Sequence, residues 1–228
     1  MPRRGGEDLN AWWRGGLALV GPFVAAAFDV DVRGAENVPP GPAVLAGNHV
    51  SALDGPLLAI ATGRSIRRMT RFLVAAEFFD RRRFGWALRL YRQIPVRRGA
   101  GDADALGEAV RTVSRGALAG IFPEGGVNGD PGRGLRRGHT GVARIALAAG
   151  APVVPVGIWG AQHRWPLPGL HLGRPFRTRV AIVFGRPLQP SGAIGSPEDM
   201  QAFTGEVMSA LETQVAAAAL VARSPRAG

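Results

Sequence analysis

The sequence predicts a single α/β domain in which helices flank a mostly parallel β-sheet, preceded by an N-terminal apolar helix. The first observation is that short apolar runs alternate with helix-like segments along the chain, which is typical of parallel sheets covered by helices. The second is that 228 residues, 46% of them hydrophobic and 20% charged, suffice for one large core. The third is that the glycines and prolines are scattered without a period, which gives no sign of internal repeats.

The N-terminal part, residues 1–29, is expected to hold a disordered tail (1–8) and an apolar helix (9–28). The uninterrupted apolar stretch from Gly15 to Phe28 has 14 residues. A transmembrane helix needs about 20 apolar residues, so this segment is too short to span a membrane comfortably. The acidic residues that precede the run, and the lack of a small-residue cleavage site after it, argue against a signal peptide.

Two alternatives remain open for the apolar helix. Trp12 and Trp13 stand beside Arg14, and amphipathic aromatic rings next to a cation suit the headgroup boundary of a membrane. The helix would then lie in the membrane interface. Equally, it could pack on the core of its own domain.

The main domain is expected to run from 30 to 222, followed by a short disordered tail at 223–228. In its first half, apolar runs predict strands and amphipathic patterns predict helices. The strands are expected at 28–33, 43–48, 71–76 and 92–97, and the helices at 55–63, 81–91 and 103–116.

The second half continues the alternation. Buried strands are expected within 117–126, 151–160 and 177–188, and helices at 140–150 and 196–223. Gly150 is a natural C-cap for the first of these helices. Ser196, Pro197 and Asp199 occupy the N-cap, N1 and N3 positions of the second, which is a strong helix start.

The charge indicates anionic partners. The net charge is +11, and every one of the 28 basic residues is an arginine. Such a positive field attracts nucleic acid, phosphate-bearing cofactors, acidic carrier proteins or anionic lipid. Residues 64–98 alone contain 11 arginines. The sequence contains no cysteine, which excludes disulfides, thiolate metal sites and cysteine nucleophiles.

Three polar clusters follow predicted strands directly: Asn48–Asp54, Arg97–Arg98 and Glu124–Gly126. Ligands of parallel α/β sheets bind beyond the carboxyl ends of the strands. The sequence therefore predicts a binding site where these clusters meet.

The first cluster contains a candidate acid–base pair. His49 can take a proton from a hydroxyl while Asp54 fixes the imidazole tautomer and stabilises its protonated form. Ser51 lies between them, but the chain has no Gly-x-Ser-x-Gly nucleophile elbow. The pair without a protein nucleophile suggests that the attacking hydroxyl belongs to the substrate. The alternative to an acid–base pair is purely structural. Ser51 and Asp54 are both favoured as helix N-caps, and His49 would then be a loop residue without a chemical role.

A metal site is the less favoured interpretation of the histidines. His139, His163 and His171 show no compact ligand spacing with His49. No metal and no resident cofactor is therefore expected.

Four blocks in order resemble the motifs of the PlsC-like glycerolipid acyltransferases, the family that includes 1-acylglycerol-3-phosphate acyltransferases. "NHVSALDG" is similar to the NHxxxxD motif, "RQIPVRRG" to the second motif, "IFPEGG" to the FPEG core of the third and "APVVPVGI" to the fourth. "RRGHTGVARIALAAG" resembles the segment between the third and fourth. The resemblance covers about residues 30 to 190.

The resemblance implies an O-acyltransferase of the family's fold. It transfers a fatty acyl group from acyl-CoA or acyl carrier protein to a lysophospholipid, above all 1-acylglycerol-3-phosphate, which yields phosphatidate. His49 is then the general base, Asp54 orients it, and Asn48 with nearby backbone N–H groups helps to hold the oxyanion. The resemblance also implies a peripheral or monotopic location at the cytoplasmic face of an anionic membrane. No nucleic acid partner is expected, because the sequence has no recognisable helix-turn-helix, RNP or zinc-finger pattern.

The same resemblance implies that the other two clusters bind the acceptor. Arg98 matches the motif arginine that is implicated in binding the acceptor phosphate, and Arg97 precedes it. Glu124, Gly125 and Gly126 are implied to belong to the acceptor site or to brace it. Alternatively, Glu124 is a turn carboxylate that accepts hydrogen bonds from backbone N–H groups.

The third block departs from the family pattern. Relatives continue FPEG with Thr-Arg-Ser, whereas Gly126, Val127 and Asn128 stand here in a loop about two residues longer. Another arginine would have to replace the missing one, the candidates being Arg133, Arg136 and Arg137, or the acceptor is a different lysolipid, such as one with an amino-acid head group. An acyl-thioester hydrolase and a non-catalytic lipid- or nucleic-acid-binding protein are the remaining alternatives.

Overall fold

The computed structural model describes residues 10–97, 102–165 and 177–224 of the chain. Seven strands in these ranges form one sheet: β1 (Phe28–Arg33), β2 (Ala43–Gly47), β3 (Thr70–Ala75), β4 (Ile94–Val96), β5 (Leu118–Ile121), β6 (Val153–Trp159) and β7 (Thr178–Phe184). The α-helices are α1 (Ala11–Ala27), α2 (Asp54–Ser65), α3 (Arg82–Leu90), α4 (Ala103–Ser114), α5 (Gly141–Ala149) and α6 (Pro197–Arg223). Every predicted strand and helix in these ranges is present, with ends shifted by a few residues.

The strands lie in the order β1-β7-β6-β2-β5-β3-β4. Five of the neighbouring pairs are parallel, and β6 pairs with β7 in the antiparallel direction. The prediction of a single α/β domain with a mostly parallel sheet flanked by helices is thus confirmed. Short 3₁₀ turns at 35–37, 76–78, 131–133 and 161–163 complete the described elements.

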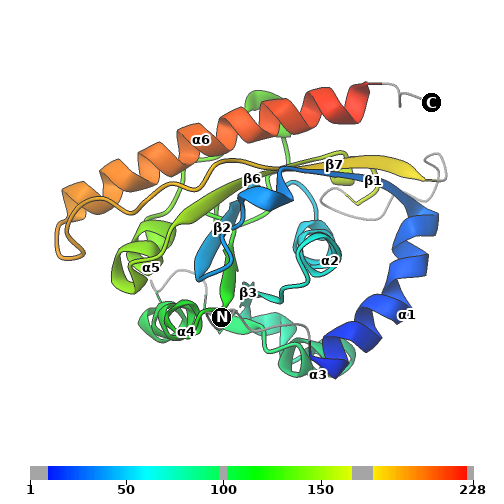
Figure 1. The fold of residues 1–228 in the computed structure, drawn as a ribbon, viewed down its shortest axis with the longest axis horizontal. Helices are drawn as coiled ribbons and strands as arrows, with labels where there is room; N and C mark the ends of the chain where they lie inside the picture. Colours follow the sequence, from blue (N-terminus) through cyan, green and yellow to red (C-terminus); the bar gives the residue numbers. More distant parts are fainter. Residues whose placement is uncertain (1–9, 98–101, 166–176, 225–228) are drawn as a thin grey trace.

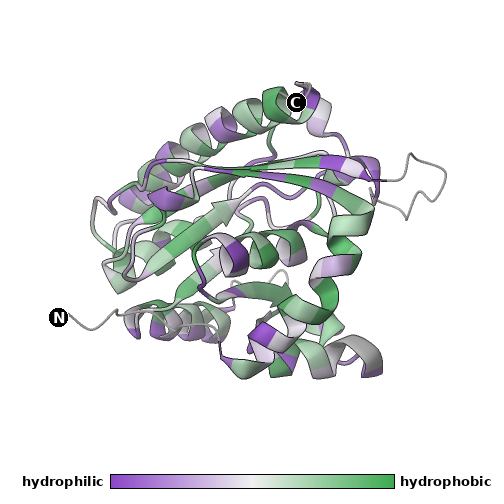
Figure 2. Cartoon of the chain, turned by 45° about the vertical axis from the view of Figure 1, so that its right-hand side comes forward, coloured by the Kyte–Doolittle hydropathy of each residue, from purple (hydrophilic) through white to green (hydrophobic). Residues whose placement is uncertain are grey.

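The sheet has a core on each face because its strands alternate. On β2, Leu45 packs in the core beneath α2, while Val44 packs in the core beneath α4, α5 and α6. Figure 1 shows α6 along one side of the sheet and α2 on the other. Hydrophobic residues dominate the central strands in Figure 2, as expected for strands covered on both faces.

The helix ends follow the predicted capping signals. The Ser196 hydroxyl accepts a hydrogen bond from the Asp199 N–H at the start of α6. Gly150 takes the left-handed conformation, with φ of 58°, at the end of α5. At the start of α1 the Asn10 side chain accepts from the Trp13 N–H.

Helix α1 runs from the β1 edge of the sheet toward α3 (Figure 1). One stripe of it packs inward: Trp13 is buried and meets the Tyr91 ring edge-on at a centroid distance of 5.2 Å. The opposite stripe, Trp12, Leu19, Val20 and Phe23, is exposed. The helix therefore combines features of both alternatives, core packing on one face and an open apolar face on the other. No helix in the three described ranges is long and apolar enough to cross a membrane.

Candidate active site

The candidate active site lies where β2 and β5 end. These strands are parallel neighbours, so the loops after Gly47 and Ile121 leave the sheet at the same edge. The sequence places the NHVSALD loop after β2 and the FPEG turn after β5. The topology thus brings two of the three predicted clusters together.

Asp54 organises the loop that carries His49. It is the first residue of α2, where a carboxylate is favoured by the positive end of the helix dipole. Its Oδ2 accepts hydrogen bonds from the backbone N–H groups of Val50 and Ser51, each at 2.7 Å. The same oxygen lies 2.9 Å from Nδ1 of His49. One buried carboxylate oxygen therefore fixes both the loop backbone and the imidazole.

The contact also fixes the tautomer of His49. An ionised carboxylate only accepts hydrogen bonds, so Nδ1 carries the proton and Nε2 remains the basic nitrogen. Burial raises the pKa of Asp54, while its hydrogen bonds from His49, Ser51 and Val50 oppose that rise. The side chain of His49 is 19% exposed, whereas that of Asp54 is fully buried. The imidazole is thus accessible to solvent, whereas the carboxylate is not.

The imidazole of His49 stacks face to face on an aromatic ring. The ring of Phe122 lies parallel to His49, with centroids 4.3 Å apart and an interplanar angle of 14°. Phe72 stacks on Phe122 in turn, at 5.7 Å. Phe122 is the residue just before Pro-Glu-Gly in the third block. Its role was missed at the sequence level, because nothing in the pattern says which ring it meets.

Glu124 braces the backbone of the His49 loop. Its side chain is buried, and Oε1 accepts the His49 N–H at 2.8 Å. Oε2 accepts the Arg136 N–H at 2.9 Å and the Asn128 amide at 3.2 Å. These contacts agree with the turn-carboxylate alternative and with a bracing role. Direct contact of Glu124 with an acceptor stays a prediction.

The turn after Glu124 requires glycine. Gly125 has a φ of 72°, which L-residues with side chains rarely adopt. A Cβ there would also lie 2.9 Å from the His139 ring. At Gly126, an added Cβ would lie 3.4 Å from the Arg136 guanidinium. The acceptor-binding role of these two glycines remains a prediction.

Asn128 ties the altered loop to the His49 loop, and sequence reasoning noted it only as the counterpart of a family serine. Its N–H donates to the carbonyl of His49 at 2.6 Å. Its buried amide donates to Glu124 and to the Gly134 carbonyl, and its Oδ1 accepts the Asp130 N–H. Asparagine is common in turns, but the sequence carries no signal for partners so far along the chain.

Two residues of the first cluster are engaged in backbone contacts. Asn48 is fully buried, and its side chain exchanges hydrogen bonds with both the N–H and the carbonyl of Ile158 on β6. Its oxyanion role therefore stays a prediction. The Ser51 hydroxyl donates to the Trp165 carbonyl at 2.8 Å and is buried. This geometry is unsuited to a nucleophile.

The arginines of the third cluster and of the altered loop are dispersed. Arg97 follows β4, three strands along from β2; its side chain is 75% exposed and lies 3.8 Å from Asp102. Arg98 lies outside the described residues. Arg133 pairs with Asp130 at 3.0 Å. Of the loop arginines proposed as replacements, Arg136 is linked to the site through its backbone bond to Glu124.

The basic segment 64–98 is not a uniform charged surface. Arg68 is buried and donates to the carbonyls of Pro39 and Gly116, and Arg71 is also buried. Arg81 and Arg89 lie over the rings of Phe78 and Phe79 respectively. Part of the charge therefore serves the fold. Within the described ranges, no cluster of three or more His, Cys, Asp or Glu side chains is arranged to hold a metal ion.

An apolar cavity of about 250 Å³ adjoins the candidate pair. It is lined by residues of α1, α2, α3 and β3, with Gly55 and Pro56 of α2 directly after Asp54. Phe72 also lines it and stacks on Phe122, the neighbour of His49. The side chains lining this cavity, which we call the α1–α3 cavity, are Trp13, Leu17, Val20, Pro56, Ala59, Ile60, Phe72, Ala87, Leu88, Tyr91 and Gln93.

Comparisons with known proteins agree with this geometry. The family described as Acyltransferase matches residues 29–159. A lyso-ornithine lipid O-acyltransferase of Pseudomonas aeruginosa is 32% identical over 197 residues, covering 81% of this chain and 70% of that protein. A 1-acyl-sn-glycerol-3-phosphate acyltransferase of the same organism is 30% identical over 150 residues, covering 64% of this chain and 55% of that protein. An uncharacterised Mycobacterium leprae protein is 32% identical over 164 residues, but the match covers 42% of its length.

The fold has a counterpart among solved structures. The crystal structure of PlsC, the 1-acyl-sn-glycerophosphate acyltransferase of Thermotoga maritima, superposes with a TM-score of 0.67 at 25% identity. The superposition covers 94% of this chain and 82% of that one. The family match spans the β2 and β5 loops and ends with β6. On the combined evidence of motifs, fold and relatives, the chain belongs to the PlsC-like glycerolipid acyltransferase family.

Proposed function

We propose that the protein transfers a fatty acyl group from acyl-CoA or acyl carrier protein to the hydroxyl of a lysophospholipid, with 1-acylglycerol-3-phosphate as the principal acceptor and phosphatidate as product. The observation that carries the proposal is the 2.9 Å contact between His49 Nδ1 and Asp54 Oδ2 beside a Ser51 that is bonded elsewhere. A base with an orienting carboxylate and no adjacent nucleophile suits a hydroxyl supplied by the substrate.

The proposed reaction proceeds in two steps. Nε2 of His49 takes the proton of the acceptor hydroxyl as its oxygen attacks the thioester carbonyl, giving a tetrahedral oxyanion. The intermediate collapses, the C–S bond breaks, and the protonated His49 returns the proton to the departing thiolate. Asp54 stabilises the imidazolium between these steps. The products are the ester and the free thiol, and the scheme needs no resident cofactor.

The remaining predicted residues have positioning or binding roles in this scheme. Asn48 and backbone N–H groups of the His49 loop stabilise the oxyanion. Arg97 and Arg98 bind the acceptor phosphate, since guanidinium groups bind phosphate in a bidentate way. Glu124, Gly125 and Gly126 hold the turn that faces the acceptor.

The α1–α3 cavity is proposed to take the acyl chain, because it is apolar and adjoins the reacting pair. Ala87 lies on its α3 wall, so Ala87→Phe is expected to fill part of it. The variant should retain activity with short acyl donors and lose it with long ones. Thioester cleavage across a series of acyl-CoA chain lengths measures this, with Ala26→Phe, at an exposed position of α1, as the matched control. An unchanged chain-length profile in Ala87→Phe would place the acyl chain elsewhere.

The exposed stripe of α1 is proposed to dock on the membrane face that supplies the acceptor. Trp12, Leu19, Val20 and Phe23 recur at helical spacing and are 45–72% exposed. Trp86 of α3 is 66% exposed as well. The positive net charge favours an anionic surface, and we place the protein at the cytoplasmic face as a peripheral or monotopic enzyme.

The double substitution Leu19→Ser with Phe23→Ser tests this docking. Because burying such a side chain contributes roughly 1.5–3 kcal/mol, the loss of both should weaken binding to anionic liposomes by at least about tenfold. Cosedimentation measures the partition. Leu220→Ser, which removes an equally exposed side chain from α6, is the control. Equal binding of both variants and the unsubstituted protein would exclude α1 as the docking face.

The experiment that tests the function is product analysis with a panel of acceptors. Purified protein is incubated with an acyl-CoA and either 1-acylglycerol-3-phosphate or lysophosphatidylcholine, and lipid products and free thiol are measured. Phosphatidate should form in step with thiol release, and His49→Ala should abolish both. Thiol release that is indifferent to every acceptor would favour the hydrolase alternative, and the absence of any His49-dependent product would refute the proposal.

Lyso-ornithine lipid is the second candidate acceptor. A relative named for that acceptor matches 81% of this chain, more than the glycerophosphate enzyme of the same organism. The altered loop supports it too, since Val127 replaces the motif arginine. Adding lyso-ornithine lipid to the acceptor panel decides between the two: a preference for it over 1-acylglycerol-3-phosphate would reassign the acceptor and leave the His49 chemistry in place.

A further inference from the structure

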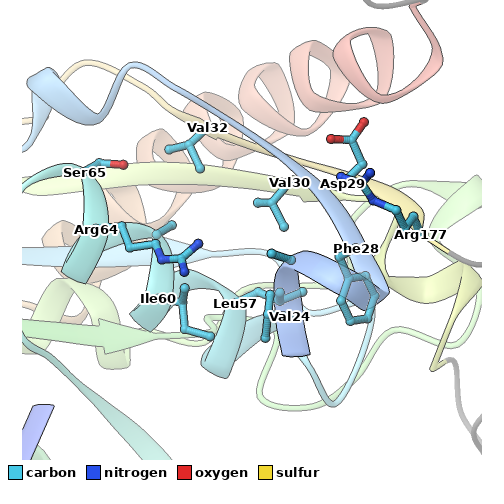
Figure 3. A pocket seen from close by; sticks show the side chains of 12 residues that line it. Val24, Phe28, Asp29, Val30, Val32, Leu57, Ile60, Arg64, Ser65 and Arg177 are labelled. Carbon is cyan, nitrogen blue, oxygen red and sulfur yellow. The ribbon is translucent and has the colours of Figure 1, made fainter. Parts of the chain in front are cut away.

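A second cavity, of about 320 Å³, lies between α1, β1 and α2. Its size is at the lower end of the range of about 300–1,000 Å³ for small-molecule sites. Most of the lining is aliphatic or aromatic, with Val24, Phe28, Val30, Val32, Leu57 and Ile60 labelled in Figure 3. We call it the α1–β1 cavity.

The two cavities are separated by close contacts between α1 and α2. Gly63 of α2 faces Leu17 of α1, and a Cβ added to Gly63 would lie 2.8 Å from that side chain. Likewise, a Cβ on Gly21 of α1 would lie 2.3 Å from the Arg64 guanidinium. Ile60 alone appears in the linings of both cavities. The α1–β1 cavity is therefore a compartment of its own and shares one wall residue with the proposed acyl site.

The three charged residues of the α1–β1 cavity lie at its two ends, with Arg64 at one end and Asp29 and Arg177 at the other. Arg64 reaches into it from α2, with its guanidinium between Val32 and Ile60 in Figure 3. Among the described residues Arg64 makes no hydrogen bond or ion pair. Asp29 and Arg177 lie at the opposite end in Figure 3. The lining carries two arginines and one aspartate, so its net positive charge favours an anion over a cation. Arg64 is exposed, so an anionic head group can reach it from solvent.

We propose that the α1–β1 cavity is an accessory binding site for a single-chain lipid with an anionic head group. The alkyl chain lies against the aliphatic residues of α1, β1 and α2, and the carboxylate or phosphate pairs with Arg64. A neutral or cationic amphiphile would bury the same apolar surface but would not gain the charge-assisted hydrogen bond that an anionic head group makes with the exposed Arg64. Since Ile60 lines both cavities, a lipid here contacts one wall of the proposed acyl site without occupying it.

Binding of matched probes tests the site without any need for turnover. Dodecanoate, dodecyl phosphate, dodecanol and dodecyltrimethylammonium share one chain and differ in charge. Calorimetric titration of the full chain below the micellar concentration of each probe should show at least one anionic probe binding about tenfold or more tighter than dodecanol and the cation. The ratio of the affinities of dodecanoate and dodecyl phosphate shows whether a carboxylate or a phosphate head group is preferred.

Four variants test whether the anionic probes bind in the α1–β1 cavity. Arg64→Gln should remove most of the preference for anions, while Arg115→Gln, an exposed arginine at the end of α4, should leave it intact. Ala25→Phe, which adds a ring at the rim of the α1–β1 cavity, should reduce the preference for anions over dodecanol, while Ala87→Phe in the α1–α3 cavity should leave that preference intact. The proposal is overturned if the anions show no preference in the unsubstituted protein, if Arg64→Gln leaves their affinity unchanged, or if Ala87→Phe alone removes the preference for anions.

Discussion

Replacing Asp54 with asparagine is expected to lower kcat by about 10²–10⁴ while leaving the fold intact. Asparagine can place its amide oxygen where Oδ2 accepts from Val50 and Ser51, so the loop geometry is preserved. It no longer supplies the negative charge that stabilises a protonated His49. Steady-state kinetics at saturating acceptor, beside thermal unfolding of the same sample, measures both effects.

The stability of Asp54→Asn relative to the unsubstituted protein should increase as the pH rises from acidic values. Burial raises the pKa of Asp54, so the folded state holds this proton more tightly than the unfolded state does. Stability from this group is therefore lost as pH rises from the unfolded pKa through the raised folded pKa. Asparagine removes that cost. Below this window both states of Asp54 are protonated, so the difference between the free energies of unfolding of the two proteins should no longer change with pH.

Ser51→Ala is the matched control for Asp54→Asn in the loop that carries His49. It removes the hydroxyl bonded to the Trp165 carbonyl but leaves the contact between His49 and Asp54. We expect kcat to change little. A decrease in kcat for Ser51→Ala as large as that for Asp54→Asn would point to a serine nucleophile. Full activity of Asp54→Asn would contradict the orienting role of the carboxylate.

Replacing Glu124 with alanine is expected to reduce both stability and turnover. Its carboxylate accepts from the N–H groups of His49 and Arg136 and from the Asn128 amide, and all three hydrogen bonds are lost, although the Asn128 amide keeps its bond to the Gly134 carbonyl. At about 1 kcal/mol or more for each, the free energy of unfolding should fall by roughly 3 kcal/mol. For a chain of this size the midpoint temperature should fall by about 6–12 °C. Turnover below that midpoint should fall because the His49 backbone is no longer fixed.

Asp130→Ala in the same loop is the control for Glu124→Ala. Asp130 has a 63% exposed side chain that pairs with the exposed Arg133, so its loss should cost less than about 1 kcal/mol. Glu124→Gln should recover part of the stability, since it keeps one accepting oxygen. If Glu124→Ala unfolds at the same temperature as Asp130→Ala, the bracing role is wrong. If it is stable but fails to bind acceptor, Glu124 contacts the substrate.

The elements of the fold were predictable because each has a local cause. Apolar runs bounded by glycine and proline mark the strands, and the cap residues Ser196 and Gly150 mark helix ends. The direction of β7 was not predictable. Its alternation of buried residues is the same in either direction, and its antiparallel pairing with β6 depends on the course of the chain between them.

The candidate site was predictable only where partners are close in sequence. His49 and Asp54 are five residues apart, so their contact follows from the loop and the start of α2. The contacts of Glu124 and Phe122 with His49 join residues more than 70 apart, and only the parallel pairing of β2 and β5 brings them together. The binding of Asn48 to Ile158 depends in the same way on β6. Sequence can name such residues but not their partners.

The measurement that tests the central claim most directly is thiol release from acyl-CoA by a stoichiometric amount of protein in a rapid-mixing experiment without acceptor. If the acceptor hydroxyl is the nucleophile that His49 activates, no thiol appears until 1-acylglycerol-3-phosphate or another lysolipid acceptor is added, and release then begins at once. A burst of one thiol per protein without acceptor would reveal an acyl-enzyme and contradict the account.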